Sequence, residues 1–388
     1  MRKCSRWVIR RTCVSALIEM VAGCSFSGSS DNIVNMPEID AVDLFCGVGG
    51  LTCGVKRAGI NVVAGYDIDG ASRFAYEENN GSKFILKDIK DLDDDEVGKL
   101  YPSHEGAFRL LMGCAPCQPF SSYNRMPREA KSRVEKMGLL AYFGKQVRNV
   151  EPDIVSMENV PQLAKEPVFE DFVNLLEGSG YHVSWQVVYA PKYGVPQNRK
   201  RLILLASRLG PIELLPPEFE DPESYPTVRD AIGSLPRISA GATCPSDNLH
   251  RARRLSALNL KRIRNSNPGG TWLDWDESLR PAAYRKSTGA TYRSVYGRLR
   301  WDKPSSTITT QFIGYGSGRF GHPEQDRALS LREGALLQTF PMDYKFIDPS
   351  VQKYAVQPIA VQIGNAVPVK LGEVIGKSIV EHVKSSAS

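Results

Sequence analysis

Residues 39–50 read Ile-Asp-Ala-Val-Asp-Leu-Phe-Cys-Gly-Val-Gly-Gly, and this stretch decides the fold. An apolar run that ends in glycines before an amphipathic segment is typical of a buried strand that turns tightly into a helix. The glycines also let a ligand approach the N-terminus of that helix. The spacing is G-x-G-G, without the third glycine of the dinucleotide fingerprint, so a nicotinamide or flavin cofactor is disfavoured. A purely structural turn is the alternative interpretation.

Outward from this stretch, short apolar runs alternate with amphipathic segments as far as Ser207. This alternation is typical of a parallel sheet covered by helices and predicts an α/β fold. The expected strands cover residues 41–45, 61–66, 84–86, 109–113, 154–157, 182–188 and 202–206. The expected helices cover residues 51–58, 71–79, 132–150 and 169–176.

The alternation of apolar runs and amphipathic segments ends after Ser207, where a long region rich in Pro, Gly, Ser and Arg begins. Regular pattern returns at residues 331–339 and continues in a helix through residues 371–382. We therefore predict one α/β domain that carries a differently built insertion. The predicted regions are an N-terminal extension (1–35), the α/β domain (36–210), the insertion (211–325) and a return to the α/β domain (326–388).

The N-terminal extension differs in character from the rest. Basic residues precede a short apolar stretch that ends in Val21-Ala22-Gly23-Cys24, which resembles a lipoprotein export signal. The stretch is short, however, and Glu19 interrupts it. We favour a disordered or mis-started extension over an export signal. No apolar stretch approaches the ~20 residues that cross a bilayer, so no membrane association is expected.

Two aspartates follow successive predicted strands. Asp67 stands at the tip of the second strand, where a carboxylate can accept hydrogen bonds from ribose hydroxyls. Asp88 follows the third strand, where it could accept a hydrogen bond from an adenine amino group. Either residue alone would more often be a helix cap or a solvated side chain. Together, at successive strand ends, they predict an adenosine site.

The fourth predicted strand runs into Cys114-Ala115-Pro116-Cys117. This single C-x-x-C lacks the second pair that a zinc site would need, so we expect free thiols and no metal. A cysteine is usually a small buried hydrophobe, but one in a rigid proline-flanked loop at a strand end is a better nucleophile candidate. Glu158 ends the fifth strand and could act as a general acid. Residues 197–201 supply cations nearby.

Together these motifs resemble the cytosine-5 DNA methyltransferase family. The matching motifs appear in family order from about residue 39 to the end, and six ordered motifs do not match by chance. They are Asp43-Leu44-Phe45 with Gly47, Gly49 and Gly50, Pro116-Cys117-Gln118 with Phe120-Ser121, Glu158-Asn159-Val160, Gln197-x-Arg199-x-Arg201, Arg332-Glu333 with residues 337–341, and Gly364-Asn365-Ala366-Val367-Pro368. One departure is Ala115, which stands where the family often has a second proline.

The resemblance implies a Rossmann-like, S-adenosylmethionine-dependent methyltransferase sheet with a smaller target-recognition domain in the insertion, of the bacterial restriction-modification type. It implies that a methyl group is transferred from S-adenosyl-L-methionine to carbon 5 of a flipped cytosine. Cys117 would be the nucleophile and Glu158 the acid, Arg201 would hold the base carbonyl or a phosphate, and Arg199 would support the thiolate side. The implied cofactor-binding residues are Phe45, Gly47, Gly49, Gly50, Asp67, Ile68, Asp88, Ile89, Pro116, Asn365 and Val367.

Double-stranded DNA is the partner that the resemblance implies, and a cognate restriction endonuclease would act as a separate protein. We expect a monomer in the cytoplasm, associated with the nucleoid. One alternative is an RNA cytosine-5 methyltransferase, but this chain lacks the Cys-Phe-Thr that transfer-RNA relatives have after the position of Phe120. The other is an inactive DNA-binding relative, against which the intact Cys117, Glu158 and Arg201 argue.

The insertion contains a basic cluster between Arg251 and Arg264 with no acidic residue. Such a cluster can neutralise phosphates, although a solvated basic loop has the same composition. The glycine-rich residues 314–319 could pass close to a duplex. Because the catalytic motifs would handle any cytosine, we expect the insertion to recognise the DNA sequence.

Overall fold

The computed structural model describes residues 37–103, 106–116, 130–284, 293–351 and 353–386, with the side chains of residues 130–137 left out. The predicted extension over residues 1–35 and the predicted nucleophile Cys117 therefore lie outside the described residues. Residues from Met36 to Ser388 form one unit, and the description below concerns that unit.

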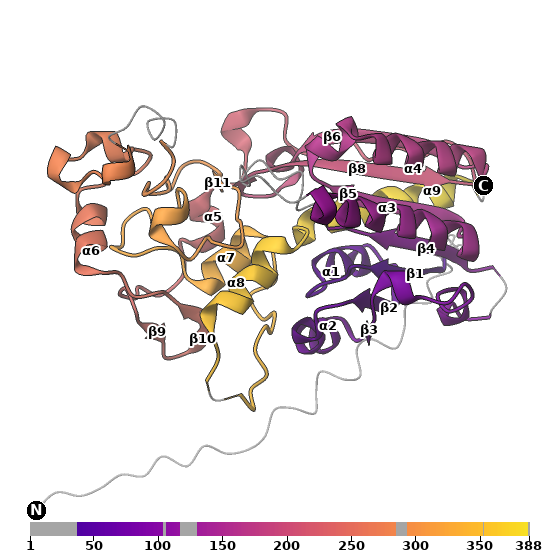
Figure 1. Ribbon diagram of the computed structural model, residues 1–388, viewed down its shortest axis with the longest axis horizontal. Coiled ribbons are helices and arrows are strands. Elements are labelled where there is room, and N and C mark those ends of the chain that lie inside the picture. The colour runs from indigo at the N-terminus through magenta and orange to yellow at the C-terminus, as the bar shows by residue number, and fades with distance from the viewer. Residues whose placement is uncertain (1–36, 104–105, 117–129, 285–292, 352, 387–388) are drawn as a thin grey trace, which may run out of the picture. The chain divides into compact units, whose positions relative to one another are not determined.

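A seven-stranded sheet in the order β3-β2-β1-β4-β5-β8-β6 forms the centre of the α/β domain (Figure 1). Its strands are β1 (Ile39–Leu44), β2 (Asn61–Asp67), β3 (Lys83–Leu86), β4 (Phe108–Gly113), β5 (Ile154–Asn159), β6 (His182–Tyr189) and β8 (Lys200–Ser207). All seven predicted strands are confirmed, with bounds that differ from the prediction by one or two residues at most of their ends.

The predicted parallel sheet contains one strand that runs in the opposite direction. Strand β8 runs antiparallel to both of its neighbours, β5 and β6, whereas β1 to β5 pair in parallel. Only residues 190–199 connect β6 to β8, and a parallel crossover needs a dozen residues or more. The short connection therefore forces the chain to return in the opposite direction.

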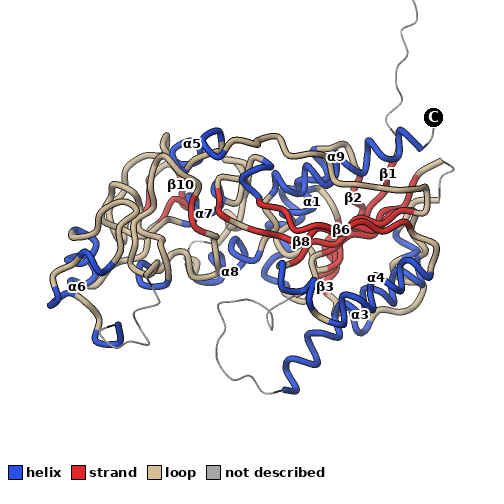
Figure 2. Tube along the Cα trace, turned by 90° about the horizontal axis from the view of Figure 1, so that it is seen from above, coloured by secondary structure: helices blue, strands red, loops and turns tan. Residues whose placement is uncertain are grey.

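Helices cover both faces of the sheet, as Figure 2 shows with the sheet seen along its edge. Helices α1 (Gly50–Arg57) and α9 (Val369–Ser386) lie on one face, and α3 (Ala130–Val150) and α4 (Pro167–Gly178) lie on the other. Successive side chains of β1 point to opposite faces of the sheet and so contribute to both layers. Ile39 and Ala41 point into the core under α1 and α9, whereas Val42 and Leu44 point into the core under α3 and α4. Helix α2 (Arg73–Asn80) packs beside β3.

Helix α9 belongs to the α/β domain although the insertion separates it from the last strand. It crosses α1 so closely that a Cβ atom on Gly54 would lie 2.4 Å from the carbonyl oxygen of Val369. Any side chain at position 54 would therefore push the two helices apart. No helix among the described residues is both long and apolar enough to span a bilayer.

A separate hydrophobic core holds much of the insertion together with the segment that follows it. The helices and short strands of this part of the chain are α5 (Val228–Ile232), α6 (Ala257–Arg264), α7 (Leu331–Leu337), α8 (Val356–Asn365), β9 (Thr243–Cys244), β10 (Asp247–Arg251) and β11 (Ser305–Ser306), which pairs with β7 (Gln197–Asn198). Helix α6 packs apart from the others, in a smaller core with Trp272 and Trp275. The side chains of α7 and α8 pack in one core with Val228, Leu249 and Phe312. Among the C-terminal helices, α9 is the one that packs on the sheet.

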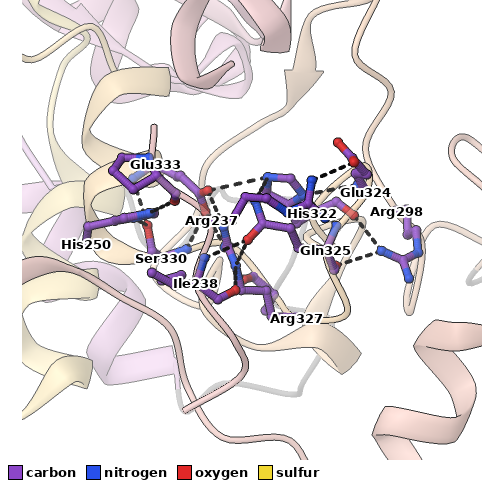
Figure 3. Close-up of polar contacts among 12 residues, drawn as sticks. Arg237, Ile238, His250, Arg298, His322, Glu324, Gln325, Arg327, Ser330 and Glu333 are labelled. Atoms are coloured by element: carbon purple, nitrogen blue, oxygen red, sulfur yellow. Dashed lines mark hydrogen bonds and ion pairs between the residues drawn. The ribbon is translucent and has the colours of Figure 1, made fainter. Parts of the chain in front are cut away.

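A buried ion pair anchors α7 within this part of the molecule (Figure 3). The guanidinium of Arg327 donates two hydrogen bonds of 2.7 Å to the carboxylate of Glu333, and neither side chain is more than 1% exposed. The Ser330 N–H donates to the same carboxylate at 2.7 Å, while the Ser330 hydroxyl accepts from the Glu333 N–H and so caps the helix. Burial lowers the pKa of the adjacent His322 to about 4, so this imidazole is neutral at pH 7.

Candidate active site

The glycine-rich loop after β1 is fixed to the end of β2. The Gly47 N–H donates a 2.8 Å hydrogen bond to Asp67 Oδ2, and the Asp69 N–H donates one of the same length to Oδ1. Gly49 begins α1 in the left-handed conformation with φ 84°. Phe45 is left-handed as well, with φ 63°, which costs a non-glycine residue strain of the kind found at ligand sites.

A cavity of about 260 Å³ lies beside this loop, at the carboxyl ends of the strands. Eight of the eleven residues predicted to bind cofactor line it: Phe45, Gly47, Gly50, Asp67, Ile68, Pro116, Asn365 and Val367. Ile68 is 70% exposed, which is unusual for so large an apolar side chain. A bound molecule would cover part of that surface.

The other three predicted residues, Gly49, Asp88 and Ile89, are not among the residues that line the cavity. A Cβ on Gly49 would lie 2.4 Å from Asn80 Nδ2, so this glycine serves close packing of the loop. The Asp88 carboxylate accepts a 3.0 Å hydrogen bond from the Lys90 N–H and caps a short helical turn, and Ile89 is buried in the core. Their contact with a cofactor stays a prediction.

Asp43 was not predicted as a site residue, although it belongs to the first motif. It is 1% exposed and lines the cavity. The Thr52 hydroxyl donates to Oδ2 at 2.6 Å, whereas Oδ1 has no hydrogen-bond donor among the described residues. Burial raises the pKa of Asp43 to about 7. A buried carboxylate oxygen without a partner, at the wall of a cavity, fits a cationic group of a bound ligand.

The predicted acid Glu158 lies at the same edge of the sheet. Gly113 at the end of β4 pairs with Met157 of β5, so Cys114 and Glu158 follow as neighbours. Glu158 is 2% exposed; Arg201 Nε lies 2.9 Å from Oε1 as an ion pair, and the Cys114 thiol donates to Oε2 at 2.9 Å. The antiparallel direction of β8 brings Arg201 here, because residue 203 pairs with Glu158 itself.

The other two side chains of the Gln-x-Arg-x-Arg motif, those of Gln197 and Arg199, do not contact Glu158. Arg199 is 4% exposed and donates to the carbonyl oxygens of Ile308 (3.3 Å) and Ala366 (3.4 Å). Gln197 accepts from the Ile308 N–H at 2.8 Å and donates to the Leu337 carbonyl at 3.1 Å. Both residues therefore join the sheet to the insertion and to the C-terminal segment. The predicted support of the thiolate by Arg199 stays a prediction, since the nucleophile lies outside the described residues.

Comparison with known proteins decides the family. The family model for C-5 cytosine-specific DNA methylases matches residues 39–381. The chain belongs to this family. The predicted family, the α/β methyltransferase fold and the activity of a DNA cytosine-5 methyltransferase are thereby confirmed. Because the family acts on DNA, the RNA alternative is not retained.

Individual relatives agree with this assignment. The methyltransferase is 51% identical over 341 residues to the Type II methylase M.HgiDII of Herpetosiphon aurantiacus, across 87% of this chain and 94% of the relative. It is 32% identical to the Type II methyltransferase M1.HphI of Haemophilus parahaemolyticus, across 88% and 86% of the two chains. A solved structure of a putative DNA modification methyltransferase encoded within an E. coli prophage superposes with a TM-score of 0.66. It is 21% identical, covers 89% of this chain and 99% of its own, and supports the fold.

Proposed function

We propose that this methyltransferase binds S-adenosylmethionine in the cavity beside the glycine-rich loop and methylates a flipped cytosine within a specific duplex sequence. The observation that carries the proposal is the contact of the Glu158–Arg201 pair with Cys114, which lines a cavity whose wall holds an unpartnered buried oxygen of Asp43. The Type II relatives further suggest the modification half of a restriction-modification system. We propose a cytoplasmic monomer, with any cognate endonuclease as a separate protein.

The cavity residues have chemistry that suits this cofactor. S-adenosylmethionine supplies, when bound, a methyl group made electrophilic by its positively charged sulfur. Asp67 would accept hydrogen bonds from the ribose hydroxyls, and Asp43 Oδ1 would accept one from the ammonium of the methionine part. Ile68 would cover one face of the adenine ring. Asn365 and Val367 would close the cavity from the C-terminal segment.

The remaining residues would activate the base. Carbon 5 of cytosine is too weak a nucleophile to take a methyl group unaided, so the Cys117 thiolate would add to carbon 6 and raise the electron density at carbon 5. Glu158 would bind ring nitrogen N3 and supply a proton as charge develops there. Arg201 would hold the base carbonyl. After methylation, loss of the carbon 5 proton and elimination would release Cys117. The role of Cys117 rests on its motif.

A trapping experiment tests this proposal. A duplex that contains 5-fluorocytosine cannot lose its substituent from carbon 5, so the nucleophile should remain attached in the presence of S-adenosylmethionine. We expect a denaturant-resistant protein–DNA adduct with this duplex and none with unmodified DNA. Methylation without an adduct would overturn the covalent route, and a protein that neither methylates nor traps any duplex would overturn the whole proposal.

The Asp67→Ala variant should bind S-adenosylmethionine about 1–3 kcal/mol more weakly, because hydrogen bonds to the ribose and to the Gly47 N–H are lost. Isothermal titration calorimetry measures this difference. The exposed Asp91 offers a matched control, since Asp91→Ala removes a carboxylate away from the cavity. Unchanged affinity in the Asp67→Ala variant would leave Asp67 a structural role only.

The buried carboxyl of Asp43 should make stability depend on pH. Its pKa is raised to about 7 in the folded protein, whereas the unfolded chain releases the proton near pH 4. The folded state therefore holds the extra proton between these values, and the free energy of unfolding falls as the pH rises. The cofactor-free protein should lose about 2 kcal/mol between pH 5 and pH 7 that the Asp43→Asn variant keeps. Urea unfolding at both pH values compares them, and parallel behaviour of the two proteins would contradict the assignment.

Sequence recognition by the insertion depends on cations that are free to contact DNA. Within the basic cluster, Arg264 pairs with Asp326, and Arg262 donates to the Leu279 carbonyl. Arg253 and Arg254 are exposed. These two are therefore the better candidates for phosphate contacts. The glycine-rich residues 314–319 also pack closely within the protein, because a Cβ on Gly316 would lie 2.9 Å from the ring of Tyr296.

Exchange of residues 211–325 for those of a relative should change the methylated sequence and leave the reaction unchanged. Arg253→Ala should weaken binding to all DNA sequences alike, while the matched Arg264→Ala, which removes an ion-paired side chain, should change it less. Methylome sequencing of a methylation-free host that expresses the soluble chimera reads the outcome. An unaltered target sequence would assign recognition to another region.

A further inference from the structure

Cys114 lies between the cofactor cavity and the carboxyl group of Glu158. Its side chain lines the cavity, and its thiol donates to Glu158 Oε2 at 2.9 Å. The backbone under it is fixed, because the Cys114 N–H donates to the Leu44 carbonyl at 3.3 Å and a Cβ on the preceding Gly113 would lie 2.5 Å from the same oxygen. The thiol is therefore presented to the carboxylate from a rigid strand end.

The two oxygens of Glu158 are held in different ways. Oε2 accepts the hydrogen bond from the Cys114 thiol. Oε1 lies 2.9 Å from Arg201 Nε but has no aligned hydrogen-bond donor among the described residues. A carboxylate oxygen has capacity for two hydrogen bonds, so Oε1, which has no aligned donor, has the larger capacity left for a substrate group. Asn159, the next residue, donates to the Ala115 carbonyl at 3.0 Å and ties the two strand-end segments together.

We propose that Cys114 is a positioning residue for the acid of the reaction. Its thiol holds Oε2 and thereby turns Oε1 toward the base. The proposal rests on the role of Glu158 in the proposed function.

This use of Cys114 differs from the metal or redox chemistry that a C-x-x-C suggests. Both of those need a thiolate, and the negative charge of the adjacent carboxylate repels one. The observed contact needs the neutral thiol, which has a proton to donate. The geometry therefore favours a hydrogen-bond donor at this position over a metal ligand or an attacking sulfur.

The test compares Cys114→Ala, which removes the donor, with Cys114→Ser, which keeps one. Methyl transfer to a duplex substrate of the purified full chain gives kcat and KM, and calorimetry gives the affinity for S-adenosylmethionine. We expect kcat to fall about tenfold in Cys114→Ala, with KM for the duplex and cofactor affinity within about twofold of the unchanged protein. Cys114→Ser, which keeps a donor at this position, should recover most of the lost kcat.

Control measurements separate positioning from packing. Cys53→Ala makes the same chemical change on α1, away from the cavity, and should leave kcat unchanged. A loss of kcat in Cys114→Ala that Cys114→Ser does not recover would overturn the proposal, as would wild-type kinetics in Cys114→Ala. If the unchanged protein itself fails to methylate DNA, the proposed function fails first, so the two failures are distinguishable.

Discussion

The Cys117→Ser variant is expected to lose methyl transfer by about 10³-fold or more while it still binds S-adenosylmethionine. A hydroxyl at this place stays protonated at neutral pH and is a far weaker nucleophile than a thiolate. The described cavity, by contrast, is lined by residues at the ends of β1 and β2, by residues 114–116 and by the C-terminal segment, and none of these residues is itself replaced. Tritium transfer to DNA and calorimetric titration of the cofactor, on one protein preparation, measure both quantities.

Cys53→Ser on α1 is the matched control, since it replaces a half-buried thiol away from the cavity. It should retain the turnover of the unchanged protein. Turnover above a tenth of the original in Cys117→Ser would move the nucleophile to another residue. Loss of cofactor affinity together with turnover would point instead to a change in folding.

The Glu333→Gln variant is expected to lose about 3–5 kcal/mol of unfolding free energy, the second large effect. Glu333 and Arg327 are both fully buried, so removal of the negative charge leaves a guanidinium without its counter-ion in a low-dielectric interior. The Ser330 N–H would also lose a charged acceptor at the start of α7. Urea unfolding at pH 7 measures the change.

Two further variants make this prediction specific. Asp302→Asn breaks an exposed ion pair with Arg300 and should change the unfolding free energy by less than about 1 kcal/mol. The double variant Arg327→Met, Glu333→Leu removes both buried charges and should recover much of the loss, because the desolvation cost disappears with the pair. An equal loss in the single and double variants would show that packing, and not charge, governs the site.

Much of the α/β domain could be predicted because its signal is local. Each strand is a short apolar run, and the motif residues stand at strand ends, which a parallel sheet gathers at one edge. The position of Asp67 in the cavity wall, and of Glu158 next to Cys114 of the same wall, follows from that rule alone. The antiparallel direction of β8 was also predictable from the sequence, because the ten-residue connection before it is too short for a parallel crossover.

Other features depend on contacts between distant parts of the chain. Arg199 and Arg201 belong to one motif, yet Arg199 reaches the carbonyls of residues 308 and 366 while Arg201 reaches Glu158. The unpartnered oxygen of Asp43 results from burial by several elements, which composition and spacing do not report. The packing of α7 and α8 in one core with Val228, Leu249 and Phe312 has the same cause, because it depends on residues far away in the sequence.

The close crossing of α1 by α9 has a consequence for how the protein is made. On the face of the sheet that α1 and α9 share, the part that packs on side chains of α9 stays uncovered until the ribosome has translated the insertion and then residues 369–386. The nascent chain must therefore keep an apolar surface exposed through most of its synthesis, and contacts so distant along the chain form slowly. Chaperone occupancy should be highest while the insertion emerges, and ribosome profiling of bound chaperones would locate that interval.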